Sequence, residues 1–171
     1  MTRRRIAVLS LCAAAFAAAG VWLWRIGFPS EERKIIRLLD ECAETVSFRA
    51  GEPPAAAVLK LRRLDSRLAD RVTIRWKRHG SIQEQEFECK ELIGHVASTR
   101  RYLKALRAEL SDLVVTVGGD TAVAEGSAQI SGIAREHRRN DPVSEEVRIE
   151  LVRREGTWRV AAVTVRDFME R

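Results

Sequence analysis

The stretch EEVRIELVRREGTWRVAAVTV (residues 145–165) contains the pattern that decides the fold. Apolar and polar residues alternate on both sides of Glu155-Gly156, which is the period of a half-buried β-strand. A two-residue turn at Glu155-Gly156 would join the two runs as a hairpin. The register that this turn predicts sorts the apolar residues onto one face, with these opposite pairs: Leu151 with Val160, Ile149 with Ala162, Val147 with Thr164, and Arg153 with Trp158. A slip of one residue would destroy this sorting, so we expect a hairpin here.

The same test succeeds at two turns nearer the N-terminus. A turn at Gly119-Asp120 predicts three apolar pairs: Val117 with Ala122, Val115 with Ala124, and Leu113 with Gly126. A turn at His79-Gly80 predicts charge pairs on one face and apolar or amide side chains on the other: Arg75 with Glu84, Arg71 with Glu88, Val72 with Phe87, Ile74 with Gln85, and Trp76 with Gln83. The chain is therefore expected to form about six strands, paired mostly antiparallel.

Three other segments have the 3.6-residue period of amphipathic helices. The first begins after Ser30, a good N-cap residue, and its apolar stripe consists of Ile35, Leu38, Leu39, Cys42 and Val46. The second is expected over residues 55–69 and the third over residues 90–110. Packed on the apolar face of a curved, mostly antiparallel sheet, the three helices predict an α+β fold.

This order of elements resembles the nuclear transport factor 2-like fold, a cone-shaped domain shared with ketosteroid isomerase-like and polyketide cyclase-like proteins. The resemblance covers residues 31–168. It is carried by the stretch quoted above and by DLVVTVGGDTAVAEGSAQISG (residues 112–132), which look like the paired late strands of that fold. The resemblance implies a fold and does not by itself imply an activity.

Enzymes of this family that resemble the isomerases use a carboxylate and a tyrosine or second acid inside the cone. Tyr102, the only tyrosine, falls on the third expected helix. The strand positions expected on the concave face carry small or apolar residues: Leu113, Val115, Val117, Ala122, Ala124, Gly126, Ala128 and Ile130. Because acid–base catalysis needs titratable groups within reach of a substrate, we predict no catalytic residue and expect a binding domain rather than an enzyme.

Two interpretations of the cone's interior remain open. In one, Trp76, Phe87 and Trp158 form the apolar wall of a pocket, and Gln83 and Gln85 orient a small apolar ligand. In the other, both glutamines lie where the first hairpin leaves the core and contact water, as glutamine usually does.

Cys42 and Cys89 are candidates for a disulfide, because an exported domain meets an oxidising compartment. Both also fit the core as free thiols, and a sequence cannot show the short separation that a bridge requires. The three histidines, at positions 79, 95 and 137, have no metal-ligand spacing with the cysteines or with one another. The sequence therefore predicts neither a metal site nor a cofactor.

An uncharged segment precedes the domain. As a helix, residues 6–24 would reach across the hydrocarbon core of a bilayer. Trp22 and Trp24 beside Arg25 resemble an aromatic belt at the far interface, and the arginines at positions 3–5, ending with Arg5, favour a cytoplasmic N-terminus. The alternative is a secretory signal that is cleaved near the alanines at positions 17–19.

We therefore expect three regions along the chain. Residues 1–5 form a cytoplasmic tail, residues 6–28 a transmembrane signal anchor, and residues 30–171 an exported domain at the inner membrane of a bacterial cell. The 30 basic and 24 acidic residues give a net charge of +6, but four of the arginines flank the anchor, which leaves +2 for the domain. This small excess does not favour nucleic acid as a partner. We expect the domain to bind a protein partner or a second copy, or alternatively a small apolar ligand in the cone, either as a carrier or as an isomerase-like or cyclase-like enzyme.

Overall fold

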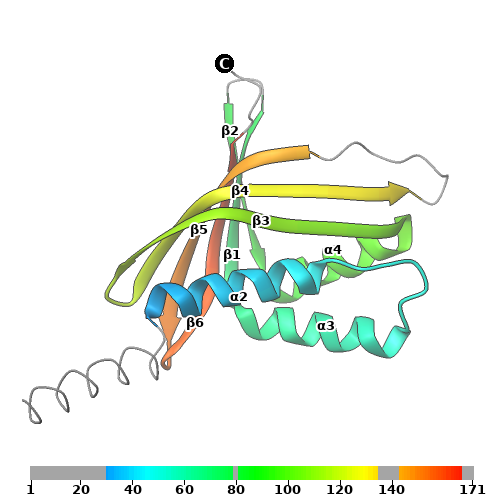
Figure 1. Cartoon of the computed structure of the whole chain (residues 1–171), viewed down its shortest axis with the longest axis horizontal. Coiled ribbons are helices and arrows are strands. Elements are labelled where there is room, and N and C mark those ends of the chain that lie inside the picture. The colour runs from blue at the N-terminus through cyan, green and yellow to red at the C-terminus, as the bar shows by residue number, and fades with distance from the viewer. Residues whose placement is uncertain (1–29, 79–80, 135–142, 167–171) are drawn as a thin grey trace, which may run out of the picture. The chain divides into compact units, whose positions relative to one another are not determined.

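The structure is a computed structural model that describes residues 30–78, 81–134 and 143–166 (Figure 1). The chain separates into two compact units, residues 1–34 and 35–171. The elements follow in the order α2 (Glu31–Val46), α3 (Pro54–Arg67), β1 (Leu68–Arg78), β2 (Ser81–Glu88), α4 (Cys89–Tyr102), β3 (Leu103–Gly118), β4 (Thr121–Ala134), β5 (Val143–Arg154) and β6 (Thr157–Arg166). The predicted α+β class, with three helices and six strands in the described part of the chain, is confirmed.

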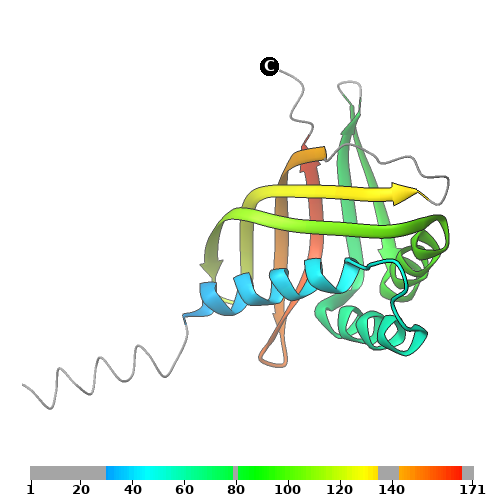
Figure 2. The ribbon, with the colours of Figure 1, turned by 45° about the vertical axis from the view of Figure 1, so that its right-hand side comes forward.

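The six strands form one sheet in the order β2-β1-β6-β5-β4-β3. Neighbouring strands are antiparallel except β1 and β6, which pair in parallel, so the sheet is mixed and mostly antiparallel as predicted. The two longest strands, β3 and β4, curve across the other four (Figure 2). This curvature gives the sheet a concave face, and side chains from α2, α3 and that face form one buried core.

The predicted β1–β2 register is confirmed at all five pairs, from Arg71 opposite Glu88 to Trp76 opposite Gln83. The turn residues His79 and Gly80 themselves lie outside the described residues. Of the two predicted charge pairs, one forms an ion pair, because the Arg75 guanidinium lies 2.7 Å from the Glu84 carboxylate, whereas Arg71 lies 3.8 Å from Glu86 rather than near Glu88.

The predicted β5–β6 register holds only near the turn. Arg153 pairs with Trp158 and Leu151 with Val160, but a β-bulge at Ala161 then shifts the pairing by one residue. Ile149 lies opposite Val163 instead of Ala162, and Val147 lies opposite Val165 instead of Thr164. An extra residue in one strand is what a bulge inserts, and here it turns Val163 and Val165 toward the core.

An irregularity also interrupts the β3–β4 pair. Val117–Ala122 and Val115–Ala124 form as predicted, but the register shifts between Ser111 and Val114, so Leu113 does not pair with Gly126. Asp112, within this irregularity, has a φ of 55°, in the left-handed region that non-glycine residues rarely adopt. The turn chemistry at Gly119-Asp120 therefore predicts the near half of the hairpin and not the bulge beyond it.

The third predicted helix is too long. α4 ends at Tyr102, and residues 103–110 belong to β3. Leu103, Leu106 and Leu110 have helical spacing, yet Leu106 and Leu110 also share one face of a strand. Pairing of this segment with residues 128–134 of β4 decides the conformation. The second helix similarly ends at Arg67, and Leu68 begins β1.

The predicted membrane anchor, with Arg5, Trp22, Trp24 and Arg25 at its interfaces, lies outside the described residues. Among the residues that the structure does describe, no helix has the length and apolar character needed to cross a membrane.

Candidate functional site

The concave face of the sheet is buried at one end and uncovered at the other. Alternate residues of β4 share this face, and their exposed fraction rises from 3% at Ala122 and 0% at Ala124 to 49% at Ile130. The same gradient runs along β5, from 1% at Leu151 to 53% at Val143. Ile130 and Val143 lie directly opposite each other. The helices therefore leave an apolar part of the concave face open where β4 ends and β5 begins.

A carboxylate that the sequence analysis missed lies in this open part. Glu145 pairs with Ala128, so it is on the concave face between Val143 and Val147, and it is half-buried. The expectation of a face without acids considered β3 and β4 alone. Extending the two-residue period of β5 back from Val147 would have placed Glu145 there.

Trp76 lies at the same end of the concave face. Backbone pairing connects it through Val165 of β6 and Val147 of β5 to Gly126 of β4, one row away from Glu145. Its neighbour on β2 is Gln83. The half-buried indole therefore extends the open apolar surface across the sheet.

The five predicted pocket residues do not lie together. Gln85 and Phe87 follow Gln83 on the same face of β2, with both glutamines exposed and Phe87 half-buried. Trp158 lies at the opposite end of β6 from Val165, is 4% exposed, and belongs to the core. The structure thus groups Trp76, Gln83, Gln85 and Phe87 on one face and separates Trp158 from Trp76.

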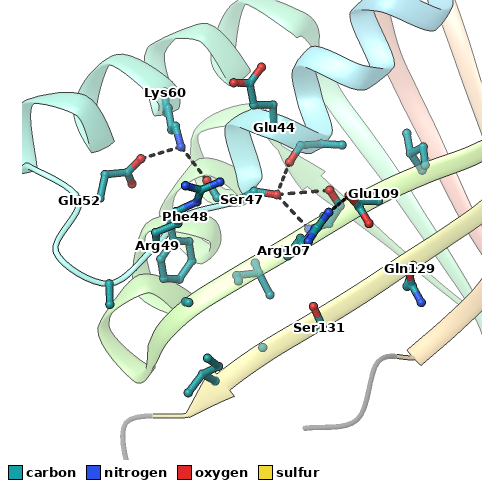
Figure 3. Close-up of a pocket in the computed structure, with 18 of the residues that line it drawn as sticks. Glu44, Ser47, Phe48, Arg49, Glu52, Lys60, Arg107, Glu109, Gln129 and Ser131 are labelled. Atoms are coloured by element: carbon teal, nitrogen blue, oxygen red, sulfur yellow. Dashed lines mark hydrogen bonds and ion pairs between the residues drawn. The ribbon is translucent and has the colours of Figure 1, made fainter. Parts of the chain in front are cut away.

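A second candidate site is a groove of about 1390 Å³ beside the edge strand β3 (Figure 3). It is lined by α2, the segment after it, Lys60 of α3, residues 105–111 of β3 and residues 129–133 of β4. Arg107 and Glu109 form an ion pair on its floor at 2.5 Å. Asp40 and Glu44 of α2 have no ion-pair partner among the described residues, so one wall of the groove carries two unpaired negative charges.

One end of the groove is fixed by Glu52, which joins two helices. Its carboxylate lies 2.6 Å from Nζ of Lys60 on α3 and 2.5 Å from the Arg100 guanidinium on α4. Burial alone would raise the pKa of Glu52, but the hydrogen bonds and charges of Lys60 and Arg100 outweigh it, and the pKa is lowered. Arg100 also lies over the Phe48 ring, 4.8 Å from its centroid.

The exposed edge of β3 is closed by the residues before this network. Phe48 exchanges backbone hydrogen bonds with Leu106 at 2.8 and 3.0 Å. One residue before Phe48, the Ser47 hydroxyl accepts a hydrogen bond from the backbone N–H of Ala108 at 2.9 Å. One backbone bridge and one side chain thus cover part of the β3 edge in place of a seventh strand.

Comparison with known proteins supports the fold assignment. No protein-family model and no curated protein sequence matches the chain. Among solved structures, the Kfla4162 protein of Kribbella flavida aligns with a TM-score of 0.66 at 15% identity, over 80% of this chain and 90% of that protein. A nuclear transport factor 2-like superfamily protein of Salmonella enterica aligns with a TM-score of 0.60 at 9% identity, over 78% and 87%. A nuclear transport factor 2-like protein of Pseudomonas putida gives 0.56 at 14% identity, over 81% and 87%.

The fold is nuclear transport factor 2-like. In the terms of this fold, the concave face is the inside of the cone and the residues around Ile130 and Val143 form its open end. At these low identities the likeness extends to the arrangement of elements and not to activity.

The two cysteine thiols that the structure describes are unreactive. Cys42 and Cys89 are free thiols, so the suggested bridge is not formed in the structure. Burial raises the pKa of Cys42 to about 12. Burial and the Asp65 carboxylate, to which the Cys89 thiol donates a hydrogen bond at 3.3 Å, raise the pKa of Cys89 to about 11. Both thiols are therefore protonated near pH 7, and the described residues contain no cluster of three potential metal ligands.

Proposed function

We propose that the domain is a non-catalytic binding module that takes an apolar ligand at the open end of its cone, and that residues 6–28 hold it at a bacterial inner membrane. The observation that carries this proposal is the exposure of Ile130 and Val143, 49% and 53%, at one end of a concave apolar face whose other end is buried. Exposed apolar surface in a concave site is typical of ligand binding. Trp76 extends the apolar wall, and Gln83 offers amide hydrogen-bond groups beside it.

The chemistry of the open end favours binding over catalysis. Glu145 is the single carboxylate that pairing places on the concave face of β4 and β5, and Tyr102 is 74% exposed at the end of α4. The acid–tyrosine pair that isomerase-like relatives use is therefore not assembled from these two residues. Glu145 instead provides one polar contact by which an apolar ligand with a donor group is oriented.

The test compares two exposed apolar residues on opposite faces of the same sheet. Ile130→Gln changes the open end, whereas Val114→Gln changes a residue of the outer face that is 69% exposed. With 1-anilinonaphthalene-8-sulfonate as the probe, we expect Ile130→Gln to weaken binding at least five-fold and Val114→Gln to leave it unchanged. Equal binding by both variants and the parent chain would rule out the open end as the site.

A protein partner at the groove beside β3 is the second candidate function. It is favoured by the two unpaired acids, Asp40 and Glu44, on the α2 wall of the groove, which suit a basic segment of a partner. The double variant Asp40→Lys, Glu44→Lys is expected to lose a partner cross-linked to the parent chain in membranes. Glu155→Lys, which makes the same change at an exposed turn, is the control. Loss of the partner in both variants, or in neither, would contradict a role of the groove.

The predicted anchor has its own test. A chain that resists alkaline carbonate extraction and retains its N-terminal residues supports a retained span. A chain that is released and begins after residue 19 supports the cleaved signal instead.

A further inference from the structure

The exposed side of α3 combines apolar and basic residues in an unusual order. Its exposed residues between positions 55 and 66 lie three and four apart on one side of the helix: Ala55, Val58, Leu59, Arg62, Arg63, Asp65 and Ser66. Val58 and Leu59 are 51% and 56% exposed, while Leu64 on the opposite side is 4% exposed. We call Ala55, Val58, Leu59, Arg62 and Arg63 the α3 stripe.

The basic residues of α3 divide according to the side they occupy. Lys60 and Arg67 are not part of the stripe, and each has an acid partner, Glu52 at 2.6 Å and Glu41 at 2.7 Å. Arg62 and Arg63, in the stripe, have no ion-pair partner among the described residues. The fold thus neutralises the inner cations of this helix and leaves the outer two uncompensated, directly beside its exposed apolar residues.

From this arrangement we infer that the α3 stripe lies on the surface of an anionic lipid bilayer. Val58 and Leu59 enter the interface, and Arg62 and Arg63 contact lipid phosphates, which is how amphipathic helices bind membranes. A second copy of the chain fits the stripe less well. Asp65, three residues after Arg62, is the one acid on the exposed side of α3, so two such sides facing each other would bring four arginines together with only two carboxylates, and the excess positive charge opposes pairing.

Two apolar side chains and two arginines make a weak contact by themselves. The contact becomes effective when the domain is tethered, because a short tether turns binding into an intramolecular event. This step rests on the proposed anchor at residues 6–28, which would hold the domain within a few residues of the bilayer. The stripe would then orient the domain on the membrane that anchors it.

The experiment uses the full chain in liposomes, with a nitrobenzoxadiazole label on a single cysteine. The native cysteines, Cys12, Cys42 and Cys89, are replaced by alanine, and the label is placed either at Leu59→Cys or, as the control, at Val114→Cys. Val114 is 69% exposed, compared with 56% for Leu59, but belongs to the outer sheet face. In vesicles containing 30% phosphatidylglycerol and lipids with a doxyl group near the headgroup, we expect at least two-fold stronger quenching at position 59 than at position 114.

A charge reversal separates the roles of the arginines. Arg62→Glu, Arg63→Glu is expected to remove the excess quenching at position 59, as is the replacement of phosphatidylglycerol by phosphatidylcholine. Equal quenching at positions 59 and 114, with circular dichroism unchanged from the parent chain, would overturn the inference. Carbonate extraction of the same vesicles tests the anchor separately. If the chain stays in the vesicles but position 59 shows no excess quenching, membrane binding by the α3 stripe is refuted and the anchor is not. If the chain is extracted but position 59 still shows excess quenching on added vesicles, the anchor is refuted and binding by the stripe is not.

Discussion

Among the glycines that the structure describes, Gly126 has the closest neighbouring backbone. A Cβ atom there would lie 2.6 Å from the carbonyl oxygen of Ser111 and 3.2 Å from Cα of Leu113, so the backbone of the β3 irregularity would have to move. We expect Gly126→Ala to lower the free energy of unfolding by about 1–3 kcal/mol, the usual cost of overpacking. Gly94 is the control, because a Cβ atom there meets nothing within 4 Å and the residue is exposed in α4. In urea unfolding, Gly94→Ala should stabilise the protein by about 0.5–1 kcal/mol; losses of equal size in both variants would contradict this explanation.

Glu155 occupies a backbone conformation that suits another residue better. Its φ is 51° and that of Gly156 is 76°, as in the hairpin turn that prefers Asn-Gly. Glu155→Asn should therefore raise the free energy of unfolding by about 0.5–1 kcal/mol, since asparagine tolerates the left-handed region. Thermal unfolding would measure the gain, and Glu155→Ala, which has no such tolerance, should give none. An equal gain with alanine would show that the Glu155 side chain, and not its backbone, is the cause.

Ser47 lets an irregular segment protect a strand edge. Its hydroxyl accepts from Ala108 N–H at 2.9 Å and lies 2.8 Å from the carbonyl oxygen of Ala43, to which it donates. Ser47→Ala would leave the Ala108 N–H without this acceptor and should cost about 1–3 kcal/mol of unfolding free energy. Ser66→Ala, which removes a hydroxyl on the exposed side of α3, is the control.

We also expect Ser47→Ala, and not Ser66→Ala, to aggregate faster than the parent chain, because the β3 edge is less protected. Light scattering would measure the aggregation, and equal scattering by both variants would contradict a protective role of Ser47.

The Glu52 network should make the packing of α3 and α4 sensitive to acid. Because the pKa of Glu52 is lower in the folded protein than in an unfolded chain, its contribution to stability is present above the unfolded pKa and is lost as the pH falls through the folded one. The parent chain should therefore lose more unfolding free energy than Glu52→Gln between pH 6 and pH 3. Glu109→Gln, in an exposed pair, serves as the comparison. Parallel pH profiles for the parent and Glu52→Gln would exclude Glu52 as an acid-sensitive group.

At the level of elements, the sequence predicts what turns and periodicity determine and misses what tertiary contacts determine. The β1–β2 register follows from charge pairing across a two-residue turn, and every predicted pair forms. The shift at Ala161 arises inside a continuous run of apolar residues, where either register leaves an apolar set inward. Likewise, the spacing of Leu106 and Leu110 fits both a helix and a strand, and only the partner strand decides.

At the level of the whole molecule, the candidate site depends on distances that a sequence does not contain. Alternation places Trp76 and Trp158 on apolar faces, but Trp76 of β1 pairs with Val165 at one end of β6, whereas Trp158 lies at the other end of β6 in the core. Glu145 was within reach of sequence reasoning, because it continues the period of Val147. The groove beside β3 was not, since it combines α2, α3, β3 and β4.

A row of alternating charges crosses the outer face of the sheet and links its two halves. Arg75 of β1 contacts Glu84 of β2 at 2.7 Å and reaches over β6 to Glu150 of β5 at 3.4 Å. This reach is possible because the β6 residues between them, Ala162 and Thr164, are small. The row continues through Arg148 to Glu125 of β4 at 2.8 Å. Arg75 is therefore the side chain that joins the β1–β2 hairpin to the rest of this row.

Replacing Arg75 tests whether the row stabilises the assembled sheet. The Arg75 side chain is 30% exposed, so screening limits its contribution, and we expect Arg75→Met to lose about 0.5–1 kcal/mol of unfolding free energy in 20 mM salt. In 1 M salt the loss should largely disappear, because the Debye length then falls to about 3 Å. Arg107→Met is the matched control, since Arg107 pairs with Glu109 of its own strand and joins no separate elements. A loss for Arg75→Met that is independent of salt would mean that its aliphatic stem, and not the row of charges, holds the hairpin to the sheet.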